Sequence, residues 1–339
     1  MGQFPREWAI AFGTHLFESA LSRVGEAFSS DSVIELPARP AAARPSNPAA
    51  IVAAQRFSEF DLHFDAEAGI LWCNFDFSAR PCFTASVLAE AKQIQSLVRR
   101  LSTEAAGGDP AVRYLVLGSR AAGVWNLGGD LALFADLIRR GDREGLRRYA
   151  HDCCEVGYTN ATVFGLPVIT IALVQGEALG GGFVAALSSN VIVAERSARF
   201  GLPEILFNLF PGMGAFTFLS RRIAPGLAER MILSGEIYTA EQLHALGVVD
   251  VLAADGEGAD AVYAYVGRGS RRHAAHVAVR EARRVVQPVK FEEMTRIADL
   301  WVDAALKLSD ADVRKMLRLA AAQDRRRART LPREAIPAE

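Results

Sequence analysis

The sequence predicts an α/β fold, and three observations support this prediction. Apolar, strand-like runs alternate with helix-like segments from about Phe57 to Leu252. Glycine-rich loops join several of these runs, as is typical where a strand ends close to the next helix. The pattern beyond Gly256 is almost wholly helical. The predicted regions are a helical extension with a linker (1–50), an α/β core (51–255) and a C-terminal helical region with a basic tail (256–339).

The composition is that of a globular protein with a large core. Half of the 339 residues are hydrophobic and 23% are charged. The formal net charge of −1 argues against nucleic acid as an obligate partner. The four cysteines and six histidines lack disulfide-framework and metal-ligand spacing, so we expect free thiols and no metal. No apolar run is long enough to span a membrane and no secretion-signal pattern begins the chain, so we expect a cytoplasmic protein.

The first fifty residues predict a helix followed by a linker. Apolar residues recur at three- and four-residue spacing between 7 and 29, which predicts an amphipathic helix. Leu36–Ala50 contains four prolines among alanines and is typical of a semi-extended linker.

The core is expected to begin with two strands, near Phe57–Phe64 and Gly69–Phe77. Thr84 is the candidate N-cap of a long helix that ends near Glu104. The further strands are expected near 112–118, 167–173, 190–195 and 248–252.

Three consecutive glycines, Gly180–Gly182, form the most informative motif. They follow the apolar run 167–173 and precede a helix-like segment that starts at Phe183. Backbone N–H groups at a helix N-terminus favour developing negative charge, and glycine lets a bound group approach them closely. This pattern predicts an oxyanion hole for a thioester or ester carbonyl; the alternative is a tight turn that only helps the helix to pack.

A second glycine motif, Asn126–Leu131, follows the apolar run 112–118. Gly128 and Gly129 stand where a loop enters the next helix, and Asp130 is placed to be its N-cap. Two backbone donors from separate strand–loop–helix units can therefore converge on one carbonyl oxygen.

These two motifs, together with Phe200–Glu204 and Phe210–Ala215, resemble the motifs of the crotonase (enoyl-CoA hydratase/isomerase) superfamily. The likeness runs from about Ser58 to about Leu252 and implies a spiral of stacked ββα turns. It also implies that Gly129 and Gly181 donate to the oxyanion, and that the C-terminal helices cover the acyl site and form trimer contacts. A narrower likeness, to bacterial diffusible-signal-factor synthases, rests on four segments: Gly69–Cys73, Trp125–Asp130, Leu206–Gly214 and Trp301–Leu306.

The acid/base residues follow the superfamily pattern only in part. The resemblance implies two glutamates, of which the second is present as Glu204 and the first is replaced by Val184. Apolar neighbours would desolvate Glu204 and raise its pKa, although a Pro-Glu pair is also an ordinary helix start. Since a valine cannot move protons, the chain lacks one of the two carboxylates that the resemblance implies for dehydration.

Several other residues are candidates with weaker support. The candidate walls of an acyl pocket, each of which is also a plausible core residue, are Trp125, Phe183, Val184, Met213 and Trp301. The polar residues considered for the missing acid/base role are Glu177, Asp130, Asn126 and Asn208. Arginines and lysines from Arg314 to Arg329 make the tail basic, which predicts a solvated helix face or, alternatively, a docking patch for an acidic carrier protein or coenzyme phosphates.

The sequence therefore predicts an enzyme that dehydrates, isomerises or hydrolyses a fatty acyl thioester. Its substrate would be carried by coenzyme A or by the phosphopantetheine of an acyl carrier protein, with no other cofactor. The alternative is a catalytically silent acyl-binding or partner-regulating homologue, which the replacement by Val184 favours. We expect a homotrimer or a dimer of trimers.

Overall fold

A computed structural model describes residues 47–103 and 110–330, with the side chains of 164 and 322–330 excepted. The helix predicted between 7 and 29 lies outside these residues. The described residues belong to one compact unit, and the C-terminal helices are part of it. Within the described residues, no helix is both long and apolar enough to cross a membrane.

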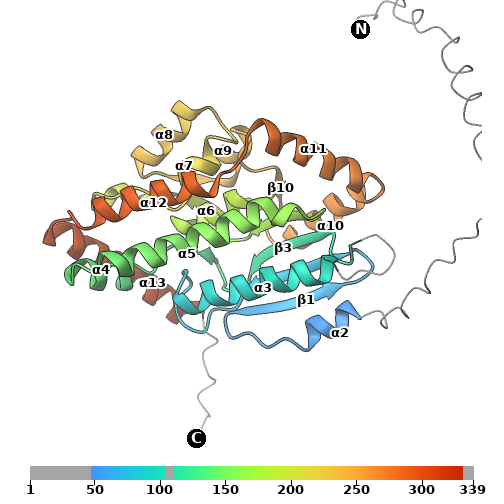
Figure 1. Cartoon of the computed structure of the whole chain (residues 1–339), viewed down its shortest axis with the longest axis horizontal. Coiled ribbons are helices and arrows are strands. Elements are labelled where there is room, and N and C mark those ends of the chain that lie inside the picture. Colours follow the sequence, from blue (N-terminus) through green and yellow to red (C-terminus); the bar gives the residue numbers. More distant parts are fainter. Residues whose placement is uncertain (1–46, 104–109, 331–339) are drawn as a thin grey trace, which may run out of the picture. The chain divides into compact units, whose positions relative to one another are not determined.

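Ten strands and three short 3-10 helices (η) alternate with α-helices in the described residues (Figure 1). The strands are β1 Phe60–Asp65, β2 Ile70–Phe75, β3 Tyr114–Ser119, β4 Val124–Asn126, β5 Ile169–Val174, β6 Glu177–Leu179, β7 Val191–Glu195, β8 Arg199–Gly201, β9 Ile237–Thr239 and β10 Val251–Ala253. The α-helices are α2 Pro48–Ala53, α3 Ala85–Thr103, α4 Leu131–Arg139, α5 Arg143–Thr162, α6 Gly181–Ser188, α7 Ala215–Leu219, α8 Pro225–Ser234, α9 Ala240–Ala245, α10 Gly258–Gly269, α11 His273–Val286, α12 Phe291–Ala305 and α13 Asp310–Thr330. The 3-10 helices are η1 Val163–Gly165, η2 Pro203–Phe207 and η3 Ser270–Arg272.

The strands form two sheets that confirm the predicted spiral. The larger sheet has the order β1-β2-β3-β5-β7-β10 and the smaller one β4-β6-β8-β9. Each turn of the chain adds one strand to each sheet: β3 then β4, β5 then β6, β7 then β8. Because β3, β5 and β7 pair in parallel, and β4, β6 and β8 do the same, successive turns stack directly on one another.

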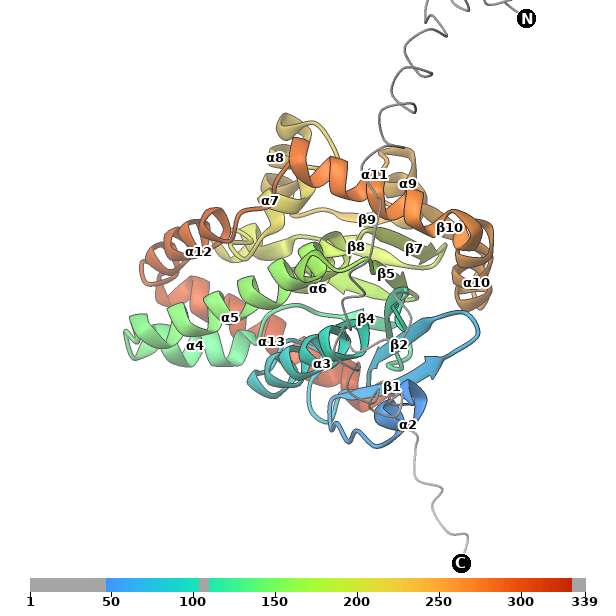
Figure 2. The same cartoon turned by 45° about the vertical axis from the view of Figure 1, so that its right-hand side comes forward.

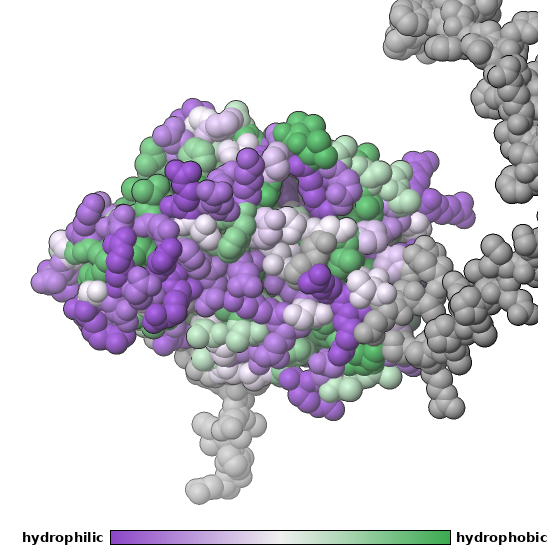
Figure 3. All heavy atoms as spheres, viewed as in Figure 1, coloured by the Kyte–Doolittle hydropathy of each residue, from purple (hydrophilic) through white to green (hydrophobic). Residues whose placement is uncertain are grey.

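Helices cover both faces of the larger sheet. On one face, α10 and α11 enclose a small apolar cluster that includes Tyr114 and Ile171. The other face packs into the main core, beneath α3, α5, α6 and α12. Figure 2 shows α12 lying along α5, and hydrophilic side chains cover this outer surface in Figure 3. Apolar sides turned inward and polar sides turned outward are typical of helices that enclose a core.

The helix boundaries confirm some local predictions and correct others. Thr84 caps α3, since its hydroxyl accepts the N–H of Val87 at 3.3 Å. The predicted linker is wrong at its end, because Pro48 begins α2 and Asn47 caps that helix. Proline suits the first turn of a helix, where its missing N–H would have no partner.

Candidate active site

The first glycine loop, between β4 and α4, is held in a fixed orientation. Asn126 Oδ1 accepts the N–H of Gly128 at 2.8 Å, and the carbonyl oxygen of Gly128 accepts the N–H of Phe83 at 2.7 Å. In a trans peptide the C=O and N–H groups point in opposite directions, so the N–H of Gly129 points away from Phe83. Asp130 then caps α4 as predicted, accepting the N–H of Leu133 at 3.1 Å.

The second glycine loop forms the N-terminus of α6. This helix begins at Gly181, two residues earlier than the sequence predicts. Gly180 adopts a φ of +51°, and its carbonyl oxygen accepts the N–H of Val184 at 3.1 Å. The N–H of Gly181 precedes the first intrahelical bond and has no acceptor within the helix. Among the described residues, neither this N–H nor that of Gly129 meets an acceptor.

The two loops touch each other. A Cβ atom at Gly181 would lie 3.4 Å from the backbone nitrogen of Gly129, and one at Gly128 would lie 2.8 Å from that of Gly181. At Gly182 a Cβ would lie only 2.0 Å from the carbonyl oxygen of Asn126. Glycine is therefore required at Gly128 and Gly182. The two predicted donors are neighbours, as an oxyanion hole needs.

Glu204 lies against the second glycine loop. It sits on η2, a single 3-10 turn opened by Pro203, where the sequence predicts a helix start. A Cβ at Gly180 would lie 2.7 Å from Glu204 Oε1, so this glycine leaves room for the carboxylate. Glu204 Oε2 is fully buried and has no hydrogen-bond partner among the described residues.

Burial raises the pKa of Glu204 to about 7. The main cause is the loss of solvation, which disfavours the charged form, and a hydrogen bond from the backbone of Glu204 itself offsets only part of it. A carboxyl group with this pKa exchanges its proton readily near neutral pH, as a general acid/base should.

An elongated cavity of about 130 Å³ opens beside these groups and brings Gly129, Gly181 and Glu204 together. Its walls are mostly apolar and come from β1–β3, α3, α5 and α12 as well as the two loops. Of the predicted pocket walls, Val184, Met213 and Trp301 line it.

One face of α6 forms the floor of this cavity. Gly181, Val184, Ala185 and Ser188 all line it, and residues three or four apart lie on the same side of a helix. The cavity therefore follows α6 for about 10 Å, from its N-terminus to its C-terminus. Val184 lies in the first turn of α6, between Gly181 and the lining residues Ala185 and Ser188.

Two predicted wall residues do not line the cavity. Trp125 on β4 is fully buried, and its ring packs edge-on against Phe75 at a centroid distance of 5.5 Å. Phe183 is also fully buried and packs against Phe200 at a centroid distance of 5.3 Å. Consecutive residues of a helix point about 100° apart, so Phe183 leaves α6 in a different direction from Val184. Trp125 and Phe183 are both core residues, next in sequence to the two glycine loops.

The polar residues considered as substitutes for the missing carboxylate also lie outside the lining. Asn126 holds the first glycine loop, and Asp130 caps α4 and pairs with Arg80 at 2.6 Å. Asn208 ends η2 in the left-handed conformation, with a φ of 60°. Glu177 lies on β6 and is half-buried. Among the described residues, no group of three or more His, Cys, Asp or Glu side chains is arranged to hold a metal.

Tyr149 is a lining residue that the sequence analysis missed. Its hydroxyl donates to the carbonyl oxygen of Phe83 and accepts the N–H of Asp130 at 3.2 Å, so it braces the first glycine loop from both sides. Nothing in the amphipathic pattern of α5 distinguishes this tyrosine from an ordinary core residue. Its role depends on the loop that the fold places beside it.

A family model for enoyl-CoA hydratase/isomerase matches residues 91–283, more than half of the chain. The chain belongs to this family. The match contains both glycine loops, Glu204 and most of the cavity lining. The segment that shows the family therefore also contains most of the candidate site.

Known relatives agree with this assignment. Over 86 residues the chain is 48% identical to the 2,3-dehydroadipyl-CoA hydratase of Escherichia coli, covering 25% of this chain and 34% of that protein. The chain spans about a third to a half of the length of the curated relatives that it matches.

Solved structures share the fold. The enoyl-CoA hydratase of Bacillus halodurans superposes with a TM-score of 0.64 at 19% identity, covering 77% of this chain and all of that one. DspI of Pseudomonas aeruginosa gives a TM-score of 0.58 at 23% identity, covering 73% and 98%. At these identities the likeness shows the fold alone, and the narrower resemblance to signal-factor synthases stays a prediction.

Proposed function

We propose that the protein is an enoyl-thioester isomerase that moves a double bond of a fatty acyl thioester from C3 to C2. The observation that carries this proposal is one buried carboxyl group, with a pKa near neutrality, beside two unpaired backbone donors in an apolar cavity. The carrier of the acyl group would be coenzyme A or acyl carrier protein.

The reaction needs one acid/base group and an oxyanion hole. The N–H groups of Gly129 and Gly181 would hold the thioester oxygen. The Glu204 carboxylate would take a proton from C2, and the electron pair of that C–H bond would spread over the dienolate, placing negative charge on the thioester oxygen. The protonated Glu204 would return the proton to C4, so that neither water nor a second carboxylate takes part.

Val184 supports isomerisation over the other chemistries. Hydration and dehydration must also move a water molecule, and thioester hydrolysis must activate one. The Val184 side chain, 6% exposed, offers a water molecule no hydrogen bond at the position where the superfamily pattern has a glutamate. The same residue favours a second candidate, an acyl-binding homologue without catalysis.

One set of incubations distinguishes these functions. The protein would be given 3-enoyl and 3-hydroxyacyl thioesters, on coenzyme A and on acyl carrier protein. Isomers have equal mass, so the conjugated 2-enoyl product is read by its ultraviolet absorbance, and mass spectrometry reads loss of water and release of free acid. We expect conversion of the 3-enoyl substrate alone. Conversion of 3-hydroxyacyl substrate would support a dehydratase, free acid a thioesterase, and binding without turnover the silent homologue.

We also propose that the protein assembles as a homotrimer or a dimer of trimers. Exposed valines on α11, with 69%, 81% and 80% of their surface accessible, support an association surface: Val279, Val285 and Val286. Leu300 on α12 adds another apolar side chain, 62% exposed. Light scattering at micromolar concentration should give a multiple of three chains, and a monomer alone would contradict the proposal.

A further inference from the structure

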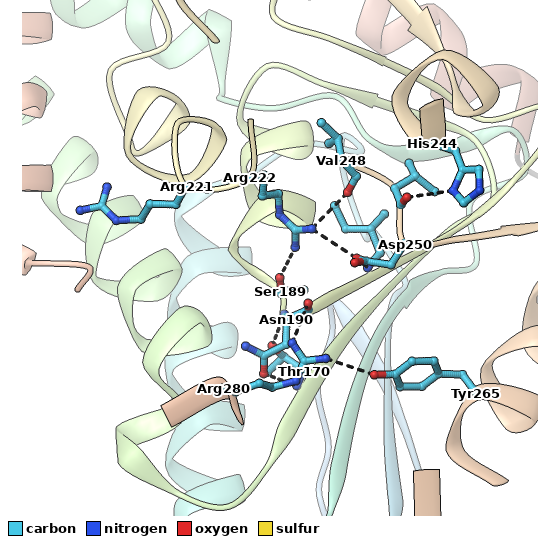
Figure 4. Close-up of polar contacts among 12 residues, drawn as sticks. Thr170, Ser189, Asn190, Arg221, Arg222, His244, Val248, Asp250, Tyr265 and Arg280 are labelled. Atoms are coloured by element: carbon cyan, nitrogen blue, oxygen red, sulfur yellow. Dashed lines mark hydrogen bonds and ion pairs between the residues drawn. The ribbon is translucent and has the colours of Figure 1, made fainter. Parts of the chain in front are cut away.

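Five arginines line a second, smaller cavity of about 80 Å³, at the C-terminal end of α6. They come from the segment after α7 and from α11, and are Arg221, Arg222, Arg280, Arg283 and Arg284. We call this cavity the arginine pocket. Figure 4 shows Arg222 and Arg280 reaching toward Ser189 and Asn190, which follow α6.

Three of the five guanidinium groups pair with carboxylates. Arg221 binds Glu293 at 2.9 Å, Arg222 binds Asp250 at 3.2 Å, and Arg284 binds Glu281 on its own helix.

The other two arginines contact only neutral acceptors among the described residues. Arg280 donates to the carbonyl oxygen of Asn190 and to the hydroxyl of Tyr265, both at 3.1 Å. Arg283 donates to the carbonyl oxygen of Arg221. The five positive charges and three paired negative charges leave two positive charges without compensation.

Buried donors in the same cluster also have no acceptor. The Nε atoms of Arg221, Arg280 and Arg284 are buried and have no hydrogen-bond partner among the described residues. A buried charged donor without an acceptor destabilises the folded state. An oxyanion offers several lone pairs to such groups and binds guanidinium in the geometry that arginine favours.

A structural role accounts for Arg222. Its side chain is 6% exposed and bonds to the carbonyl oxygens of Val248 and Ser189 as well as to Asp250, so it ties three segments together. Burial and the positive charges of Arg280 and Arg283 lower the pKa of Arg222. The structural bonds therefore bring together charges that repel each other.

We propose that the arginine pocket binds a compact oxyanion, either a carboxylate or a phosphate group. Two sources can supply it: a free anion, or a carboxylate at the far end of the acyl chain. The two cavities adjoin, since Ser188 lines both of them. Asn160 lines the larger cavity, and its side-chain amide donates to Ser188 Oγ at 2.8 Å and to Ser189 Oγ, in the arginine pocket, at 3.2 Å. The acyl source rests on the proposed function, whereas the anion site itself does not.

Titration calorimetry of the full chain tests the site. Inorganic phosphate and succinate would be titrated into the parent and into Arg280→Met and Arg283→Met. Arg283 is exposed, so its variant should fold even if Arg280→Met does not. The matched control is Arg100→Met, which removes the same charge from another basic groove, on α3.

We expect at least one of the two anions to bind the parent, and its affinity to fall about tenfold in each pocket variant and to stay unchanged in the control. A fall of equal size in Arg100→Met would show nonspecific binding and overturn the site.

A second titration identifies the source of the oxyanion. Saturated acyl-CoA molecules of equal chain length, with and without a terminal carboxylate, would be compared over a series of lengths. A preference for the carboxylated chain that Arg280→Met and Arg283→Met abolish would assign the pocket to the substrate. Binding of free anions without this preference would assign it to a free anion.

The remaining outcomes separate the two proposals. If both acyl-CoA types bind equally and no free anion binds, the arginine pocket is not an anion site, while the proposed function stands. If free anions bind the pocket and no acyl thioester binds, whether on coenzyme A or on acyl carrier protein, the anion site stands and the proposed function fails.

Discussion

The two halves of the candidate active site are built in different ways. Gly129 and Gly181 present backbone N–H groups on two loops that touch each other, and Gly128 and Gly182 leave no room for a side chain there. The acid/base half depends on side chains and holds one carboxylate, Glu204, with Val184 at the position of a second. The comparison teaches that the backbone donors and the carboxylates of such a site are separable, because here both donors are present while a single carboxylate of the described residues lines the cavity.

The largest effect is expected from Glu204→Gln. The substitution keeps the shape of the side chain but removes the proton-transfer group, so turnover of 3-enoyl thioester should fall by about 10²–10⁴. Rates from conjugated-product absorbance check this, with circular dichroism to confirm folding. Glu236→Gln, at an exposed position, is the matched control and should keep full activity. A folded Glu204→Gln protein with parental rates would remove Glu204 from the mechanism.

Two alanine substitutions at neighbouring glycines test the backbone half. The methyl group of Gly181→Ala would sit 3.4 Å from the nitrogen of Gly129, an ordinary contact, but in the space that the thioester oxygen needs. We expect a folded protein whose turnover falls by about 10²–10³. Gly182→Ala would meet the carbonyl oxygen of Asn126 at 2.0 Å and should lower the melting temperature instead.

Thermal melts and rates of the two variants check this contrast. Equal loss of stability in both would mean that Gly181 serves packing rather than the oxyanion.

The pH dependence of activity and of stability tests the role of Glu204. Glu204 must be ionised to accept a proton, so kcat/KM should rise with pH and level off above about 7. Stability should change in the opposite direction. The folded state raises the pKa from 4.5 to about 7, so it binds the proton more tightly than the unfolded chain does. Ionisation therefore destabilises the fold progressively between these two values, and the cost is complete above the upper one.

Glu204→Gln should relieve this cost. We expect the variant to be more stable than the parent by at most about 3 kcal/mol near pH 8, with the gain vanishing below about pH 5. Denaturant unfolding across this range measures the difference. A gain that does not depend on pH would mean that Glu204 is not buried as a charged group.

The smallest effect is expected from Val184→Glu, which would add a second carboxylate. We expect a measurable rise in 3-hydroxyacyl-thioester dehydration, below the 10²–10⁴ or so that a well-positioned acid/base gives, since nothing is built to orient the new side chain. Each carboxylate would raise the pKa of the other and help one to stay protonated. Mass spectrometry of the dehydrated product checks this. Binding of thioester without any gain would show that the missing glutamate is not the only barrier to dehydration.

Features fixed by local pattern were predictable from the sequence. The spiral, the Thr84 and Asp130 caps and the contact between the glycine loops follow from motifs in which a few neighbouring residues determine the backbone. The positions of Trp125 and Phe183 did not follow, because the face of an element that a cavity uses depends on how the turns stack. The arginine pocket also escaped prediction, since its members come from segments about sixty residues apart in the chain.

The cavity runs along one face of α6, so each lining residue of this helix lies at its own distance from Gly181. Val184 ends the first turn of the helix, Ala185 follows it, and Ser188 ends the second turn. In the proposed function, the number of acyl carbon atoms that fit the cavity then depends on the size of the side chains at these positions. Enlarging Ala185 would shorten the longest accepted chain while leaving the chemistry at the thioester untouched, so substrate length and reaction type can vary independently on this scaffold.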